Sequence, residues 1–231
     1  VLEYLLQGTA ADACDTSTHA GTDWRIDSVK LHLDTLSVDS ALMDSYAQHL
    51  LKGSSLVVPF RSYTNLSYTN TAASTQIFVP RTFSRVNQIW VLFQRAGANG
   101  GEKDANHFPL SADAVDTIET FVTIGSKKYP QNSYGPGAKG HLWRYVKALG
   151  MLSSGFHTTS NSFETYSTNS FLAVTDVEKV PGAAMSGFNT TNGNVVIDIK
   201  GMGTNYPTRI DIVIWHDALL TLEDGTASVS L

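Results

Sequence analysis

The chain has 231 residues, a formal net charge of -5 and a sequence pI of about 5.7. Hydrophobic residues make up 42% of it and charged residues only 16%, which excludes a disordered chain and leaves ample material for a core. The acidic balance and the scattered Lys and Arg residues give no reason to expect nucleic-acid binding.

The single cysteine, Cys14, cannot form an internal disulfide, which is compatible with a reducing compartment. No apolar run reaches the roughly 18 residues of a membrane span, and Val1 to Leu6 lacks the basic flank of a signal peptide. Because the chain begins with valine, we expect it to be a cleaved product or a domain of a longer protein. We expect residues 1–22 to be an N-terminal arm or linker and residues 23–231 to form one domain.

The first periodic segments predict a strand followed by a helix. Between Trp24 and Leu36 apolar and polar residues alternate, with a change of phase near Ser28 that predicts a bulge within the strand. From Val38 to Leu51 apolar residues recur every four positions, which predicts a helix with one apolar stripe. Gly53 lies where this helix would end.

Seven further segments predict strands. The clearest one belongs to a strand-like segment from Pro207 to Leu222 that the turn signal Asp224-Gly225 closes, and in it Ile210, Ile212 and Ile214 fall on one face of a half-buried strand. The segment from Ala114 to Ile124 is ambiguous, because its apolar spacing suits a helix while its threonines favour a strand, which we prefer. The seven are Ser55–Tyr68, Thr75–Val79, Arg85–Arg95, Ala114–Ile124, Phe171–Val174, Asn194–Ile199 and Ile210–Trp215.

The remaining pattern points to an all-β fold. A second short helix is predicted from His141 to Leu152, and the prolines and glycines between Tyr129 and Gly140 predict irregular backbone. The strands do not alternate with helices, which argues against a parallel α/β sheet, and the long uneven loops favour Greek-key connections. We therefore predict an antiparallel jelly-roll β-sandwich of about eight strands with two short helices.

One glycine-rich segment has the spacing of a dinucleotide-binding loop. It reads Gly135-Pro136-Gly137-Ala138-Lys139-Gly140 and precedes the second helix. A proline lies inside it and no hydrophobic strand comes before it, so a flexible loop ahead of a helix is the favoured interpretation.

Several acidic and imidazole side chains are candidates for acid–base or metal chemistry. His216 and Asp217 could form such a site with His32 and His141, but no two histidines have metal-ligand spacing, so a surface hydrogen-bonding pair is favoured. Paired carboxylates of a sandwich-fold glycosidase are also conceivable, although nothing sets two of them at the required separation. The candidates are Asp198, Asp211, Glu119 and Glu164.

The sequence also contains candidate nucleophiles and tyrosines that could contact a ligand. Ser153 to His157 places hydroxyls near an imidazole but lacks a nucleophile elbow, and Cys14 near His19 is interpreted as a bystander. Six tyrosines expected in loops or at strand ends suit either sugar stacking or subunit contacts: Tyr63, Tyr68, Tyr129, Tyr134, Tyr166 and Tyr206. We therefore predict no catalytic, cofactor-binding or metal site and no enzymatic activity.

The segment from Phe171 to Leu222 resembles the end of a known viral fold. A D-x-E-K segment at Asp176, a G-x-N-T turn at Gly187 and the last alternating strand resemble the close of the second roll in double jelly-roll major capsid proteins. The resemblance is to those of tailless double-stranded DNA viruses, especially the polinton-like and adintovirus groups, and Ser84 to Phe93 also resembles a strand of that fold. It implies paired rolls that trimerise into pseudo-hexagonal capsomers. Because a double jelly roll is much longer than this chain, we expect one roll of the pair, a processed half or a single-roll relative.

The sequence thus favours a structural virion protein. We expect it to assemble with copies of itself, as a trimer, and with other capsid proteins into an icosahedral shell, formed inside the host cell and carried in the virion. The alternative is a carbohydrate-binding jelly-roll module or a sandwich-fold glycosidase that uses loop tyrosines and carboxylates, with Tyr134 and Asp211 as the residues to test.

Overall fold

The structure is a computed structural model that describes residues 28–30, 32–94, 110–132, 136–150, 162–180, 185–223 and 226–230. This part of the chain contains three helices, α2 (Ser40–Leu51), α3 (Ala138–Ala148) and α4 (Phe163–Asn169). It also contains nine strands: β1 (Leu56–Thr69), β2 (Thr75–Val79), β3 (Val86–Gln94), β4 (Glu119–Ile124), β5 (Lys127–Tyr129), β6 (Leu172–Asp176), β7 (Val195–Lys200), β8 (Arg209–Glu223) and β9 (Thr226–Ser230).

The strands form two antiparallel sheets that face each other. One sheet has the order β1-β8-β3-β6, with β9 paired to β8, and the other has the order β2-β7-β4-β5. Among β1 to β8, the first strand pairs with the last, the second with the seventh, the third with the sixth and the fourth with the fifth. This nested pairing is that of a long hairpin wound into two sheets. This order is that of a jelly-roll β-sandwich, the predicted fold class.

The core lies between the sheets because alternate residues of each strand point inward. Ile210, Ile212 and Ile214 of β8 are at most 1% exposed, as the sequence pattern predicted. They meet side chains such as Ile197 and Ile199 of β7 in one continuous apolar cluster. β3 lies between β8 and β6, so the arginine-flanked segment is a central strand, as predicted.

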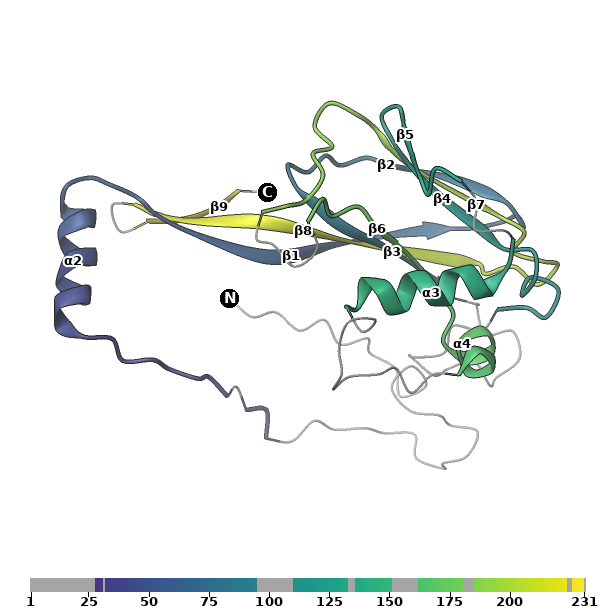
Figure 1. Cartoon of the computed structure of the whole chain (residues 1–231), viewed down its shortest axis with the longest axis horizontal. Coiled ribbons are helices and arrows are strands. Elements are labelled where there is room, and N and C mark those ends of the chain that lie inside the picture. Colours follow the sequence, from purple (N-terminus) through teal and green to yellow (C-terminus); the bar gives the residue numbers. More distant parts are fainter. Residues whose placement is uncertain are drawn as a thin grey trace.

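Two short helices cover the β6 side of the sandwich (Figure 1). α3 packs against β6, and its residues Tyr145 and Ala148 contact Trp90 and Gln88 on β3. α4 begins at the capping residue Ser162, whose side chain accepts a hydrogen bond from the Thr165 amide. The helices therefore shield an edge strand that would otherwise be open to pairing.

The predicted strand from Trp24 to Leu36 is wrong in the residues that the structure describes. Residues 28–30 and 32–36 have no regular secondary structure and are exposed, and Ser28 has a φ of 57° in place of the expected bulge. Alternation alone does not make a strand, because a strand needs a hydrogen-bonded neighbour. Residues 24–27 and Leu31 lie outside the described residues, as do residues 1–22.

Most other segments are confirmed with shifted ends. β2 has the predicted bounds, whereas β4 begins only at Glu119, because residues 114–118 form turns closed by the hydrogen bond from the Ile118 amide to the Ala114 carbonyl. α3 begins three residues before the predicted His141, and the predicted end at Leu152 lies outside the described residues. β8 continues past Trp215 to Glu223, close to the predicted end of the strand-like segment at Leu222, because β1 continues to pair with it.

Three elements were not predicted: α4, β5 and β9. β5 follows the two-residue turn Gly125-Ser126, in which Gly125 has a φ of 60°, and its sequence Lys-Lys-Tyr has no apolar alternation. Tyr129 was expected in irregular backbone, but pairing with Val122 of β4 places it in this strand.

Candidate interaction surface

The strand pair β1–β8 is longer than the sandwich to which it belongs. β3 pairs with β8 only as far as His216, whereas β1 pairs with it as far as Leu222. Beyond His216, β9 takes the place of β3 on the other side of β8. We call residues 56–61 of β1, residues 217–223 of β8, and β9 the extension. Figure 1 shows it reaching away from the two-sheet body to α2 at its far end.

The core-facing side of the sheet continues into the extension without a change of register. The β1–β8 pairing is unbroken, so the side that carries Leu66 and Ile212 in the sandwich also carries Phe60 and Ala218, then Val58 and Leu220. β9 adds to the same side, because Val229 lies opposite Leu220. We call this side the apolar extension face; it comprises Leu56, Val58, Phe60, Ala218, Leu220, Leu222, Ala227 and Val229.

No second sheet covers the apolar extension face in the described structure, because the β2-β7-β4-β5 sheet lies over the sandwich part only (Figure 1). Its side chains become exposed beyond Ala218, which is still buried at 1%: Phe60 is 39%, Val58 47% and Val229 57% exposed, while Leu56, Leu220 and Leu222 are half-buried. Monomeric proteins seldom leave contiguous apolar patches of more than a few hundred Å² in water. This face therefore has the properties of a contact surface.

Helix α2 carries a second exposed apolar surface. Leu42, Met43 and Tyr46 share one side of the helix and are between 43% and 55% exposed, and no side chain of α2 is buried. The helix forms where the four-residue period predicted it, and Gly53, with a φ of 74°, lies just past its end. We call Leu42, Met43, Tyr46 and Leu50 the α2 stripe.

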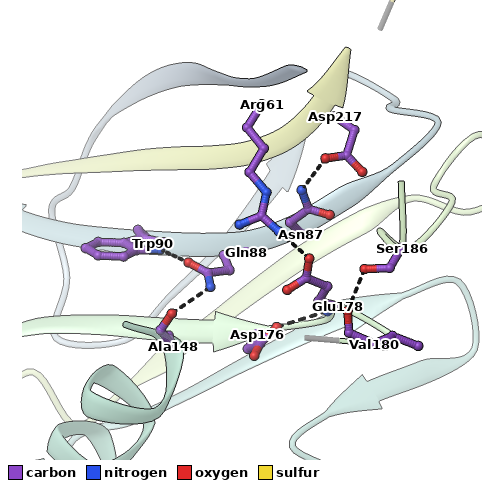
Figure 2. A network of polar contacts seen from close by, with 10 residues as sticks. All are labelled: Arg61, Asn87, Gln88, Trp90, Ala148, Asp176, Glu178, Val180, Ser186 and Asp217. Atoms are coloured by element: carbon purple, nitrogen blue, oxygen red, sulfur yellow. Dashed lines mark hydrogen bonds and ion pairs between the residues drawn. The ribbon is translucent and has the colours of Figure 1, made fainter. Parts of the chain in front are cut away.

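A polar network fixes the place where the extension leaves the sandwich (Figure 2). Arg61 of β1 forms an ion pair with Glu178, whose side chain is only 4% exposed. A register shift in β3 places Asn87 in a bulge, from which its amide donates a hydrogen bond to Asp217 over 2.8 Å. Both contacts tie β1 and β8 to the other side of the sheet, so the direction of the extension is held by buried polar groups.

The charges in this network are set by burial. Burial, and to a lesser degree the negative charge of Glu178, raises the pKa of Asp176, which accepts a hydrogen bond from the Glu178 amide. Burial also lowers the pKa of His216, whose ring stacks on Phe83 with the ring centroids 4.8 Å apart. Figure 2 shows Asp176 beside Glu178 within the polar network.

The histidine candidates are not brought together. His216 and Asp217 are 1% and 4% exposed, so the interpretation as a surface pair is wrong, because β1 and β3 flank β8 on both sides. His141 is buried on α3, while His32 lies in the exposed segment before α2. Across the described ranges, no group of three or more His, Cys, Asp or Glu side chains has the arrangement of a metal site.

The carboxylate candidates divide between different parts of the fold. Glu119 and Asp198 lie on one face of neighbouring strands β4 and β7, and Asp198 accepts a hydrogen bond from Gln76. Asp211 is not solvent-facing: it is 4% exposed and forms an ion pair with Arg209 over 3.0 Å. Glu164 lies on α4. The structure therefore places two of the four carboxylates on one face of the smaller sheet, with Lys200 directly opposite Glu119, and buries Asp211 in an ion pair.

Two backbone amides of the glycine-rich segment already donate hydrogen bonds within the protein. The amide of Gly137 donates to the Ile118 carbonyl and that of Ala138 to the Val115 carbonyl. These are the amides at the start of α3 that a phosphate would need. The geometry agrees with a structural turn; Gly135 lies outside the described residues.

The tyrosines take several roles. Tyr166, expected near a loop or strand end, is fully buried on α4 and donates to the Leu172 carbonyl, so it faces no ligand or subunit. Tyr63 is 62% exposed on β1 beside Trp215, and Tyr68 donates to the Phe78 carbonyl. Tyr206 packs partly buried against the core. The candidates Tyr134, Cys14, His19 and Ser153–His157 lie outside the described residues.

A hollow of about 120 Å³ lies between β5, α3 and β6. Its lining includes the aromatic rings of Tyr129 and Trp143 and the charged groups of Lys147 and Asp176. Aromatic walls with a few polar groups are typical of small-ligand sites. No sequence motif marked this hollow, because its residues come from three separate segments.

Comparison with known proteins gives no match to a family model and none to a curated protein sequence. Solved structures do match. A PBCV-1 virus capsid structure aligns with a TM-score of 0.51 and 7% sequence identity, over 81% of this chain and 54% of that chain. PBCV-1 VP54 aligns with a TM-score of 0.55 and 8% identity, over 84% of this chain and 55% of that chain. What they share is the fold.

This jelly roll spans about half the length of the chains that it matches. At 7% and 8% identity the likeness concerns the path of the backbone and not individual side chains. In the described part of the jelly roll, no helix combines the length and apolarity that crossing a membrane requires.

Proposed function

We propose that this chain is a structural protein of a viral capsid: one jelly roll of a major capsid protein that assembles into trimeric capsomers and an icosahedral shell. In this proposal residues 23–231 form the jelly roll and residues 1–22 an arm or linker ahead of it. The virus is a tailless double-stranded DNA virus of the polinton-like or adintovirus type, as the sequence from Phe171 to Leu222 suggests. Assembly takes place inside the host cell, and the virion is where the protein resides.

The observation that carries the proposal is the exposed apolar extension face. It continues the sandwich core, yet Val58 and Val229 are about half exposed and no described segment of the chain covers them, which suits a contact with another molecule. The fold shared with PBCV-1 capsid structures supports the same reading, since those chains are capsid components by their descriptions. The partners are therefore copies of this chain and other capsid proteins.

The role is structural and not catalytic. The buried histidines and Asp211 are engaged in hydrogen bonds, ion pairs and stacking that hold strands and helices together. An enzyme needs several such groups converging on a cleft where a substrate can reach them. The described groups instead connect the strands and helices of the sandwich.

Self-assembly of the purified full-length chain tests the proposal. Sedimentation velocity over a wide concentration range should show trimers or larger species, and negative-stain microscopy should show capsomers or shells. The driving force is burial of the apolar extension face, at roughly 25 cal/mol for each Å² removed from water. A chain that stays monomeric at high concentration would contradict the proposal.

A carbohydrate-binding module or glycosidase is the rival function, and the hollow beside Trp143 is the observation that favours it. A glycan array separates the two: a specific hit that is lost in both Trp143→Ala and Tyr129→Ala, with the fold intact, would support sugar binding. Binding that depends on Tyr134 or Asp211 would support the site suggested by the sequence. No hit, together with assembled particles, supports the capsid role.

A further inference from the structure

Two apolar surfaces of this chain lie near each other without covering each other. The α2 stripe is exposed, with Leu42 at 43%, Met43 at 55% and Tyr46 at 45%, and the apolar extension face is exposed at Val58 and Phe60. If α2 lay on the extension of its own chain, both sets would be buried. Instead α2 stands across the far end of the extension (Figure 1).

The two surfaces match in length and chemistry. α2 has 12 residues, so it is about 18 Å long at 1.5 Å per residue. Residues 56–60 of β1 span about 17 Å at roughly 3.4 Å per residue. None of the residues of the apolar extension face is charged. A helix stripe laid on a sheet face is one of the standard ways in which two layers bury apolar surface.

The link between α2 and β1 directs the helix away from its own extension. The amide of Lys52 donates to the Gln48 carbonyl, that of Gly53 to Leu50 and that of Ser54 to His49. Gly53 adopts a φ of 74° in this turn, a left-handed conformation that glycine accepts readily. With the turn closed by three backbone hydrogen bonds, the α2 stripe is presented outward to another molecule.

We propose that α2 of one copy covers the apolar extension face of a neighbouring copy. This proposal rests on the proposed self-assembly and names the contact that performs it. Six exposed side chains of the α2 stripe and the apolar extension face together present on the order of several hundred Å², and a standard interface takes about 800 Å² from each partner. They are Leu42, Met43, Tyr46, Val58, Phe60 and Val229.

We assign the contact to a second copy of the chain because each copy carries both an α2 stripe and an apolar extension face. Each chain offers one helix stripe and one uncovered sheet face, so exchange between copies satisfies both at once. The exposed large apolar residues elsewhere on the described sandwich are scattered: Tyr63 on the outer side of β1, Phe78 on β2, Trp143 on α3 and Val180 after β6. None of these forms a surface as long as the α2 stripe.

Cysteine cross-linking between two differently tagged chains tests the exchange. In a Cys14→Ser background, one chain carries Tyr46→Cys in the α2 stripe and the other, of different length, carries Val58→Cys in the extension face. After co-assembly and mild oxidation, a disulfide between the two can form only between copies. We expect this heterotypic product to be at least tenfold more abundant than that of the control pair Gln48→Cys and Val58→Cys, because Gln48 lies on the opposite side of α2.

A double variant with Tyr46→Cys and Val58→Cys in the same chain tests whether α2 instead covers the extension of its own chain. If its cross-link forms within a single chain and the mixed chains give no heterotypic product, α2 folds back on its own extension and the exchange is wrong. The exchange is equally wrong if the assembled protein gives no α2–extension cross-link of either kind. In both cases assembly by wild-type chains leaves the proposed capsid function standing, whereas a wild-type chain that never assembles overturns that function as well.

A surface variant measures the strength of the contact. Leu42→Lys with Tyr46→Lys should weaken self-association at least tenfold, while Ala41→Lys with Gln48→Lys, which adds the same charge on the other side of the helix, should leave it within about twofold. Because no α2 residue is buried in the single chain, both variants should keep the circular dichroism spectrum and thermal midpoint of wild type. Equal self-association of the two variants would overturn the proposal.

Discussion

His141 illustrates how a buried histidine holds a helix against a sheet. Its Nδ1 donates to the Gly137 carbonyl over 2.9 Å, so its Nε2 is the acceptor for the Thr120 hydroxyl at 3.0 Å. The Thr120 oxygen in turn accepts a hydrogen bond from Arg144. The chain of contacts joins the start of α3 to β4, in the sheet that α3 does not otherwise cover.

The neutral form of His141 is required for these contacts. Burial, assisted by the positive charge of Arg144, lowers the pKa of His141 from 6.5 to about 3. Below pH 6.5 the unfolded chain binds a proton that the folded chain refuses, so the free energy of unfolding falls as the pH decreases from about 6.5 towards 3.

We expect wild type to lose up to about 3 kcal/mol more stability than His141→Gln between about pH 7 and pH 4, since each pH unit in this window costs about 1.4 kcal/mol. Urea unfolding at several pH values measures the difference. Comparing the two proteins cancels the contributions of Asp176 and His216, whose pKa values are also shifted. Parallel pH profiles for wild type and variant would show that His141 titrates normally in the folded protein.

At the scale of elements, β8 is the strand to which the larger sheet is attached. It pairs with β1 along its whole length and with β3 and β9 in succession on its other side. The same sheet is thus covered in one half and uncovered in the other. A single strand therefore provides both the centre of the core and the apolar extension face.

Two valines of this sheet test that division. Val91 of β3 is 2% exposed and Val58 of β1, in the apolar extension face, is 47% exposed. Val91→Ala removes two buried methyl groups and leaves a cavity, so we expect it to cost about 2 kcal/mol of unfolding free energy. Val58→Ala, the matched change on the extension, should cost less than about 0.5 kcal/mol in the single chain. Urea unfolding at low protein concentration checks both, and equal losses would mean that the extension is covered within one chain.

At the scale of the whole molecule, the jelly roll consists of a two-sheet body with a continuous core and an extension that has only one sheet. The body buries its apolar residues between the two sheets. Arg61, Glu178, Asn87 and Asp217 hold the extension in a fixed direction. A ribbon that presents an uncovered apolar face is suited to repeated contacts between identical copies.

Because the apolar extension face has no charged residue, self-association should resist salt. Raising NaCl from about 0.1 M to about 1 M shortens the screening length to about 3 Å and weakens exposed ion pairs, but it does not weaken apolar burial. We expect the dissociation constant, measured by sedimentation velocity, to change by less than about threefold. Dissociation at high salt would instead indicate that ion pairs hold the copies together.

Local patterns in the sequence determined the elements with strong periodicity. The alternating isoleucines at 210, 212 and 214 predicted which side of β8 faces the core, and the four-residue period of Leu42, Tyr46 and Leu50 predicted α2. These succeed because the side-chain direction in a strand or helix depends only on the spacing along the chain. The same rule failed for residues 28–30 and 32–36, since alternation does not supply a neighbouring strand.

Only the tertiary structure decided which strands pair, and that choice decided everything of functional interest. Whether Val58 and Leu220 are core or surface depends on where the second sheet ends, and whether His216 and Asp217 are buried depends on the strands that flank β8. Such facts arise from residues more than a hundred positions apart, as in the pairing of Leu56 with Leu222. A sequence pattern describes near neighbours in the chain, whereas burial is a property of neighbours in space.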